Sequence, residues 1–169
     1  MNFISQFFLL LALTLFCNNT VQNRFDEPWQ SFIANEKHCL ANAIWFEARG
    51  ESFEGMQAVA EVIVNRTKAK GFPNSVCKVV KQNVQFSYLN KAKGRINLDV
   101  SEITSSKNPL IASKARKSID ISNKILDGAY QRLLPYDTLW FHTKQVQPGW
   151  SKKFVRVKTI DNHHFYRRK

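Results

Sequence analysis

The sequence has few acidic residues and no hydrophobic run long enough to span a membrane. Lys and Arg number 25 against 13 Asp and Glu, so the formal net charge is +12. Such an excess draws a protein toward polyanions such as nucleic acid or an anionic cell envelope, and charge alone does not choose between them. The main apolar run covers only residues 7–17, whereas a helix needs about 20 apolar residues to cross a bilayer.

Recognisable metal and cofactor motifs are also absent. The sequence has no CxxC or HExxH pattern, and its four histidines are not spaced as zinc ligands. It has no GxSxG turn, phosphate-binding loop or glycine-rich dinucleotide motif. We therefore expect neither a metal site nor a bound cofactor, and any chemistry must come from the side chains themselves.

Length and composition fit one globular domain preceded by a targeting segment. The chain has 169 residues, of which 44% are hydrophobic and 12% aromatic, and this is enough for a core. We interpret residues 1–20 as a signal peptide or short membrane anchor, residues 21–30 as a polar connector and residues 31–169 as the domain. Export to the periplasm or cell wall follows from this interpretation. A buried N-terminal helix is the alternative.

The spacing of apolar residues changes along the domain. A helical period predicts helices over residues 31–48, 56–66, 75–81 and 109–126. After Pro135 the period becomes two, which predicts strands over residues 138–142, 154–160 and 163–166, with a turn at Asp161-Asn162. The predicted fold class is therefore α+β, mainly helical, with a small C-terminal antiparallel sheet.

Three further expectations concern particular segments. Leu110 and Ile111 are expected on the core face of the fourth helix. Residues 83–108 are polar and weakly periodic, which indicates a long surface segment of the kind that is more often functional than idle. Cys39 and Cys77 fall in the first and third helices. In an exported protein we expect a disulfide between them, and the alternative is two buried thiols.

The strongest candidate for chemistry is Glu47, on the last turn of the first predicted helix. Its neighbours Trp45 and Phe46 are aromatic, and an apolar environment disfavours the charged form of a carboxyl group. A carboxyl group kept protonated near neutral pH can act as a general acid. Arg49 would oppose this effect if it were close, but positions i and i+2 do not share a helix face. A surface acid with an ordinary pKa is the alternative.

Several short motifs occur in one order along the chain. They are WFEARGE ending at Glu51, VNR ending at Arg66, FPNSVC ending at Cys77, QFS ending at Ser87, WFH ending at His142 and NHHFY ending at Tyr166. This ordered set, spanning about three-quarters of the chain, resembles the SleB/CwlJ cell-wall hydrolase family. One departure concerns Asp161, which stands where the family often has Gly. This predicts a left-handed backbone at that position.

The resemblance implies a lysozyme-like catalytic domain that acts on the glycan strands of peptidoglycan. It implies that Glu47 is the catalytic acid and base of a lytic transglycosylase, which cleaves between N-acetylmuramic acid and N-acetylglucosamine and leaves a 1,6-anhydro product. The residues that the resemblance places along the glycan groove are Gln85, Phe86, Ser87, Trp140, His142, His163 and Tyr166. The expected partners are peptidoglycan strands and, by charge, the anionic envelope, and the expected state is a monomer.

The residues themselves fit one catalytic carboxylate better than two. A two-carboxylate glycosidase needs a second acid across the sugar, and the sequence offers no obvious one. The alternatives are a hydrolytic muramidase and a basic, non-enzymatic protein that binds the wall or nucleic acid. Specific nucleic-acid binding is disfavoured by the export signal and by the lack of a basic recognition helix.

Overall fold

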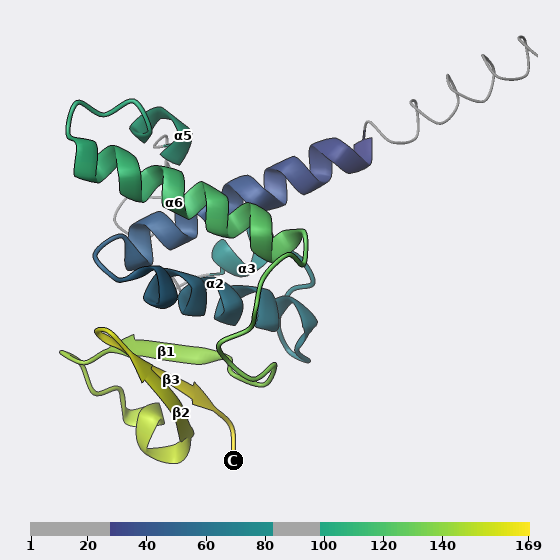
Figure 1. Ribbon diagram of the computed structural model, residues 1–169. Coiled ribbons are helices and arrows are strands. Elements are labelled where there is room, and N and C mark those ends of the chain that lie inside the picture. Colours follow the sequence, from purple (N-terminus) through teal and green to yellow (C-terminus); the bar gives the residue numbers. More distant parts are fainter. Residues whose placement is uncertain (1–27, 83–98) are drawn as a thin grey trace, which may run out of the picture. The chain divides into compact units, whose positions relative to one another are not determined.

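The computed structural model describes residues 28–82 and 99–169 (Figure 1). The chain divides into two compact units, Met1–Asn35 and Glu36–Lys169. In the first unit, residues 28–35 are helical, and the rings of Trp29 and Phe32 stack with centroids 5.6 Å apart. Helical structure therefore includes residues 28–30, which were assigned to the connector. Within the described ranges, none of the helices combines the length and apolar character needed to cross a membrane.

The second unit begins with the four predicted helices and one that was not predicted. Residues 36–48 are helical, and they are followed by α2 (Phe53–Lys68), α3 (Val76–Val80), α5 (Val100–Ile103) and α6 (Pro109–Leu126). Helix α5 lies in the stretch 83–108 that was expected to be a surface segment, and its Val100 is buried, so the expectation is wrong for that part. Helix α6 starts at Pro109, as predicted, because the Asn108 side chain accepts hydrogen bonds from the Leu110 and Ile111 amides and Pro needs no such bond at this end. It stops before Gly128, whose φ of 72° lies in the left-handed region.

Helix α2 lies at the centre of the helical layer. Ser52 caps its first turn by accepting a hydrogen bond from the Gly55 amide. Every residue from Gly55 to Arg66 is buried, because α3, α6 and strands β1 and β2 all contact this helix (Figure 1). The apolar core gathers around it, with Leu40, Ile44, Val59 and Ile63 fully buried. A helix covered on all sides explains why its apolar residues are not confined to one stripe.

The prediction that Leu110 and Ile111 face the core is wrong. These side chains are 68% and 40% exposed. The buried residues of α6 begin at Ala112 and continue through Ile125. The first turn of α6 therefore extends beyond the elements that cover the rest of the helix, and its two apolar residues fit the helical period but remain exposed.

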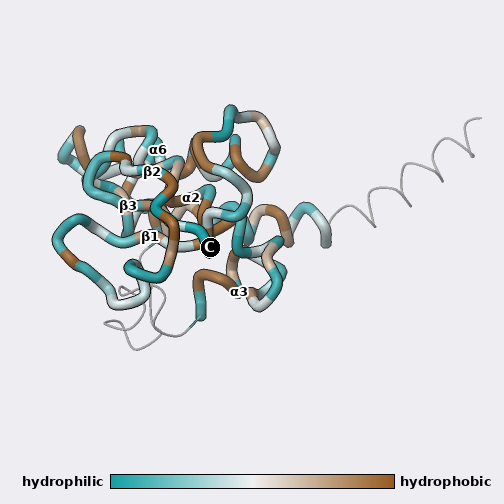
Figure 2. Tube along the Cα trace, turned by 90° about the horizontal axis from the view of Figure 1, so that it is seen from below, coloured by the Kyte–Doolittle hydropathy of each residue, from teal (hydrophilic) through white to brown (hydrophobic). Residues whose placement is uncertain are grey.

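The C-terminal part forms the predicted three-stranded antiparallel sheet, and its strand order is β1-β3-β2. Its strands are β1 (Trp140–Thr143), β2 (Val155–Ile160) and β3 (His163–Arg167), and a 3-10 helix, η1 (Gly149–Lys153), precedes β2. Hydrophobic and basic residues alternate along the first four residues of β2, and hydropathy along the chain is drawn in Figure 2. Phe165, at the centre of the sheet, is fully buried in the main core. The turn between β2 and β3 places Asp161 at a φ of 47°, the left-handed conformation expected there.

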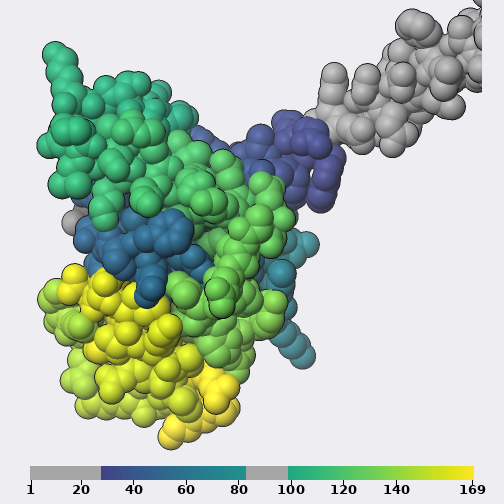
Figure 3. Space-filling view, in the orientation of Figure 1, coloured from purple at the N-terminus to yellow at the C-terminus, as the bar shows by residue number. Residues whose placement is uncertain are grey.

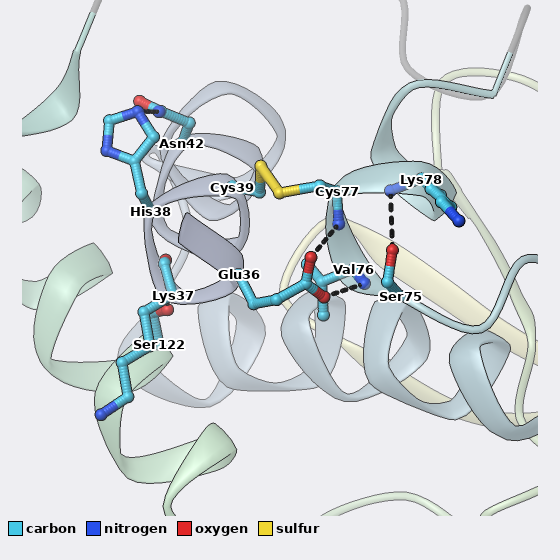
Figure 4. The surroundings of a disulfide bond; sticks show 10 residues. All are labelled: Glu36, Lys37, His38, Cys39, Asn42, Ser75, Val76, Cys77, Lys78 and Ser122. Atoms are coloured by element: carbon cyan, nitrogen blue, oxygen red, sulfur yellow. Dashed lines mark hydrogen bonds between the residues drawn. A yellow bond between two sulfur atoms is a disulfide. The ribbon is translucent and has the colours of Figure 1, made fainter. Parts of the chain in front are cut away.

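Cys39 and Cys77 form the expected disulfide, which joins helical residues 36–48 to α3. The carboxylate of Glu36 lies beside it and accepts hydrogen bonds from the Val76 and Cys77 amides at 2.5 and 3.3 Å (Figure 4). These amides belong to the first turn of α3, which has no partners for them within the helix. A covalent bond and a buried carboxylate therefore hold the same short helix.

The connector between α6 and β1 has little regular structure, yet side chains of α2 hold it at several points. Glu61 is fully buried and accepts hydrogen bonds from the Leu133 and Leu134 amides at 3.0 and 2.9 Å. The side-chain amide of Asn65 donates hydrogen bonds to the Pro135 and Thr138 carbonyls, both at 3.0 Å. These contacts fix the point at which the chain enters β1.

Candidate active site

A cavity of about 740 Å³ opens between the helical layer and the sheet. Glu47 and Arg66 come from the helical layer. The remaining lining residues come from β1, the segment that follows it, and β3, and they are Trp140, Phe141, His142, Thr143, Val146, Pro148, Trp150, Phe154 and His163. One carboxylate and one guanidinium therefore face a wall that is mostly aromatic.

Glu47 is held at the cavity by the last turn of its helix. Trp45 and Ala48, on either side of it in sequence, are buried in the core, so the backbone at Glu47 is fixed. Burial raises the pKa of the Glu47 carboxyl from an ordinary value of 4.5 to about 7, and the positive charge of Arg66 limits the rise. At neutral pH this group can both give and accept a proton, which is the property required of a general acid that later acts as a base.

Arg66 is the positive charge of the site. Its guanidinium is buried, its Nε donates to the Leu139 carbonyl at 2.8 Å, and its Cζ lies 5.4 Å from the centroid of the Phe72 ring. Burial lowers the pKa of Arg66 to about 10, and the negative charge of Glu47 partly opposes this fall. The side chain therefore stays charged at neutral pH and is held at the base of β1.

The other charged residues of the EARGE motif turn away from the cavity. Arg49 lies over the Trp45 ring, with its Cζ 5.4 Å from the ring centroid. Glu51 accepts hydrogen bonds from the Asn162 amide at 3.0 Å and from the Asn162 side chain at 3.4 Å. Glu51 precedes the Ser52 cap and therefore lies outside the first turn of α2, whereas Glu54 lies within that turn. Glu47 is the only carboxylate among the described residues that line the cavity.

His142 is fixed by two hydrogen bonds that also favour one tautomer. Its Nδ1 lies 2.9 Å from the Thr143 carbonyl, which can only accept, so Nδ1 carries the hydrogen. In the neutral ring, Nε2 then accepts from the Tyr166 hydroxyl at 3.0 Å. The Tyr166 ring stacks on His142 with centroids 5.1 Å apart. Tyr166 is not among the cavity-lining residues, and it acts as a support behind His142.

His163 forms another part of the wall and is almost fully buried. Its Nδ1 lies 3.8 Å from a carboxylate oxygen of Glu51, and its ring meets the Phe141 ring edge-on with centroids 5.4 Å apart. Burial lowers the pKa of His163, although the charge of Glu51 opposes this. The ring is therefore neutral at neutral pH and can accept or donate a hydrogen bond inside the cavity.

The aromatic wall contains two tryptophans. Trp140 packs against Phe154 with centroids 4.5 Å apart, and Trp150 meets the rings of both His142 and Tyr166 edge-on at 5.5 Å. Flat aromatic rings beside polar groups form a surface suited to sugar rings, which present apolar faces and polar edges. Sequence reasoning named Trp140 but missed Trp150, which stands in a polar stretch without a strand or helix pattern.

The structure thus brings together Glu47, Trp140, His142 and His163 from the predicted site. Gln85, Phe86 and Ser87 lie outside the described residues, and their place along the groove stays a prediction. Sequence reasoning also missed the role of Arg66, although the residue ends an apolar helix face. A buried arginine requires a compensating negative charge nearby. The position of Arg66 at the end of an almost wholly buried helix could therefore have indicated a carboxylate partner. The described residues contain no group of three or more His, Cys, Asp or Glu side chains placed to hold a metal.

Comparison with known proteins gives a family match over most of the second unit. Residues 50–166 match the sequence profile of the family described as Cell Wall Hydrolase. The matched range includes Arg66, Trp140, His142 and His163, and Glu47 lies three residues before it.

Two curated relatives carry the name spore cortex-lytic enzyme. The protein from Bacillus subtilis strain 168 is 41% identical over 71 residues, which are 42% of this chain and 23% of that protein. The protein from Oceanobacillus iheyensis is 29% identical over 136 residues, which are 80% of this chain and 43% of that protein. The chain thus spans less than half the length of these relatives.

Two solved structures resemble the chain over most of their length. The catalytic domain of the germination-specific lytic transglycosylase SleB from Bacillus anthracis is 25% identical, with a TM-score of 0.56, and the match covers 79% of this chain and 94% of that one. The catalytic domain of the Bacillus cereus SleB protein gives a TM-score of 0.55 at 25% identity, over 79% of this chain and 91% of that one. The predicted lysozyme-like α+β fold is confirmed by these similarities.

Proposed function

Because this chain belongs to the cell wall hydrolase family of the SleB/CwlJ type, we propose that it cleaves the glycan strands of peptidoglycan as a lytic transglycosylase. The bond cut is the one between N-acetylmuramic acid and N-acetylglucosamine. The observation that carries this proposal is Glu47, a single carboxyl group with a pKa of about 7 in a cavity with an aromatic wall.

In the first step, protonated Glu47 gives its proton to the glycosidic oxygen, and the bond between that oxygen and the anomeric carbon breaks. In the second step, the Glu47 carboxylate takes the proton of the C6 hydroxyl of the muramic acid. The C6 oxygen then bonds to the anomeric carbon and closes the 1,6-anhydro ring. Glu47 ends the cycle protonated, as it began, and no water is added.

Arg66 and the aromatic wall support these steps. The charge of Arg66 keeps the pKa of Glu47 near neutrality, although burial favours a higher value. It therefore stabilises the carboxylate that exists between the two steps. Trp140 and Trp150 provide flat faces for sugar rings, and the neutral ring of His163 provides a hydrogen-bonding nitrogen for hydroxyl or acetamido groups. The ring of His142, whose two nitrogens are already hydrogen-bonded, adds contact surface.

A hydrolytic muramidase is the nearest alternative, and the charge inventory disfavours it. The two-carboxylate mechanism requires a second acid on the far side of the sugar. Residues 83–98 contain neither Asp nor Glu, so that segment cannot supply one. Among the described residues that line the cavity, Glu47 has no carboxylate companion. Since peptidoglycan lies outside the cytoplasmic membrane, the proposal places the protein in the periplasm or cell wall.

The test compares Glu47→Gln with Glu51→Gln on purified cell walls. Glu47→Gln keeps the shape of the side chain and removes the proton, so we expect muropeptide release to fall by roughly 10²–10⁴-fold. Glu51→Gln is the matched control, because it makes the same chemical change outside the cavity, and we expect it to affect mainly stability. Mass spectrometry of the wild-type products should show 1,6-anhydro ends.

The outcomes separate the alternatives. Reducing ends in place of anhydro ends would establish a muramidase. Near-normal release by folded Glu47→Gln, with a dead Glu51→Gln, would assign the chemistry to the other carboxylate. Wall binding with no release by the wild type would favour a non-enzymatic binding protein.

A further inference from the structure

The positive charge of the chain is concentrated in the C-terminal part that contains the sheet. Residues 140–169 contain eight Lys or Arg and only one acid, Asp161, so these 30 residues contribute +7 of the net +12. They gather at one end of the second unit (Figure 3). The Asp161 carboxylate accepts hydrogen bonds from Ser52. The Arg167 guanidinium forms an ion pair with the Asp137 carboxylate, with a nitrogen–oxygen distance of 3.1 Å. The other seven bases make no ion pair with any described residue.

One of these bases contacts a residue of the cavity wall. The guanidinium carbon of Arg168 is 5.3 Å from the centroid of the Trp140 ring, and Trp140 lines the cavity. This position over an aromatic face holds the cation beside the cavity without neutralising it. The Arg168 side chain is exposed, so the charge remains available to a bound group.

Two further bases lie on the His142 side of the cavity. Lys144 directly follows Thr143, which lines the cavity. Arg156 lies opposite Tyr166 in the β2–β3 ladder, and Tyr166 is bonded to His142. The ring of His164 lies 5.5 Å from that of His142. The pKa of His164 is lowered by burial and, as the next largest cause, by the charge of Arg156, and Lys144 acts in the same direction. Both cations are exposed and close to this part of the wall.

We call Lys144, Arg156 and Arg168 the cationic rim. We propose that the cationic rim binds carboxylates of the peptide stems that branch from the glycan strand in the cavity. The protein therefore favours strands that carry free carboxylates. The inference rests on the proposed function for one point only, which is that a glycan strand occupies the cavity.

The position of the rim favours carboxylates of the bound strand over a separate anionic polymer. Stems branch from the same muramic acid residues whose bond is cut, so a strand held against Trp140 and His142 brings its carboxylates to the rim at a high effective concentration. A separate polyanion, such as teichoic acid, would gain nothing from proximity to the cavity. It would contact equally the unpaired bases on η1 and β2, such as Lys152 and Lys158.

The experiment measures binding of full-length protein to cell walls stripped of teichoic acid, with Glu47→Gln as the background so that no cleavage occurs. Half of the walls have their stem carboxylates converted to amides by carbodiimide coupling. We expect co-sedimentation affinity to fall roughly three- to thirtyfold on amidated walls, since three exposed ion pairs are lost. The variant Lys144→Gln/Arg156→Gln/Arg168→Gln should bind both kinds of wall with the same, lower affinity. The matched control is Lys70→Gln/Lys78→Gln/Lys107→Gln, which removes the same charge from exposed positions away from the cavity, and it should keep the preference.

Turnover by the protein with an intact Glu47 separates the two proposals. If untreated and amidated walls bind and are cleaved equally well, and cleavage depends on Glu47, the rim proposal is wrong and the proposed function stands. If the preference is equally lost in the control variant, the effect is one of net charge and the rim proposal is wrong. A third outcome is a protein that prefers untreated over amidated walls only when the cationic rim is intact, and yet cleaves neither kind of wall. That result would support the carboxylate contact and contradict the proposed function.

Discussion

The carboxylate of Asp161 occupies the space that a side chain on Gly55 would need. A Cβ built on Gly55 would clash with Oδ2 of Asp161 and would lie 2.8 Å from Cβ of Glu51. The same Oδ2 accepts hydrogen bonds from the Ser52 amide at 2.7 Å and from the Ser52 hydroxyl at 2.5 Å. These bonds lower the pKa of Asp161. The turn between β2 and β3 thus docks onto the first turn of α2 at a position where only glycine fits.

Gly55→Ala should therefore destabilise the fold by about 1–3 kcal/mol, the usual cost of overpacking a close contact. Urea unfolding measures this loss. Asp161→Gly removes the clashing carboxylate and suits the positive φ, so the double variant should recover part of the loss. A double-mutant cycle in which the two effects simply add would show that the contact with Asp161 is not the cause.

Glu47→Gln should stabilise the protein at alkaline pH while it removes activity. The folded carboxyl has a pKa of about 7 and the ordinary value is 4.5. Between these values the folded state binds the proton that the unfolded state has lost, so wild-type stability falls as pH rises from about 4.5 to about 7. The variant does not titrate, and it should match the wild type at pH 4 and exceed it by up to about 3 kcal/mol at pH 8.

Chemical denaturation at the two pH values gives this difference directly. Glu102→Gln, at an exposed acid on α5, is the control and should show no comparable gain. Equal stability of wild type and Glu47→Gln at pH 8 would mean that burial does not perturb the carboxyl.

Arg66→Met should move the alkaline limb of the pH–rate profile to higher pH. The charge of Arg66 lowers the pKa of Glu47, so its removal raises that pKa further, and the protonated acid persists to higher pH. Arg66→Lys is the control, because it keeps the charge while it loses the planar guanidinium. Its limb should stay near the wild-type position. An unshifted limb in a folded Arg66→Met would separate Arg66 from the proton chemistry.

Replacing both Cys39 and Cys77 with Ala should cost about 3–4 kcal/mol. The bond closes a loop with a sequence separation of 38, and the chain-entropy model gives a stabilisation of this size. Glu36 still binds the α3 amides in the variant, so the native fold should persist at low urea. Reductant should lower the urea midpoint of the wild type and leave that of the variant unchanged. A variant as stable as the oxidised wild type would contradict the prediction.

The elements of the fold could largely be read from local sequence. Ser52 and Asn108 cap their helices through their own side chains, and the β2–β3 turn uses Asp161-Asn162. Each of these features depends on residues close in sequence. Spacing and turn chemistry therefore predicted the start of α6 at Pro109 and the turn at Asp161-Asn162, although neither cap was named in advance. The exposed Leu110 shows the limit of this approach, because a helical period cannot say where the covering elements end.

The polar contacts of the site could not be predicted because their partners are distant in sequence. Glu51 has the position of a helix-terminal acid, yet it binds Asn162, which is 111 residues away. Arg66 faces Glu47 only after α2 packs against the helix before it, and it is held by the Leu139 carbonyl. The carboxyl of Glu47 itself was found from its aromatic neighbours, but the charge that tunes it has no local signature.

The connector of residues 127–139 has a consequence for how the chain tolerates change in length. Irregular links between a helix and a strand usually accept insertions and are favoured sites for circular permutation. Here successive side chains of α2 hydrogen-bond to successive residues of the connector. Glu61, Asn65 and Arg66 bond to the backbone of residues 134, 138 and 139 in turn. One added residue would displace the Leu139 carbonyl from the guanidinium that adjusts the acidity of Glu47. The length of this irregular connector is thus fixed by the contact between its last carbonyl and Arg66.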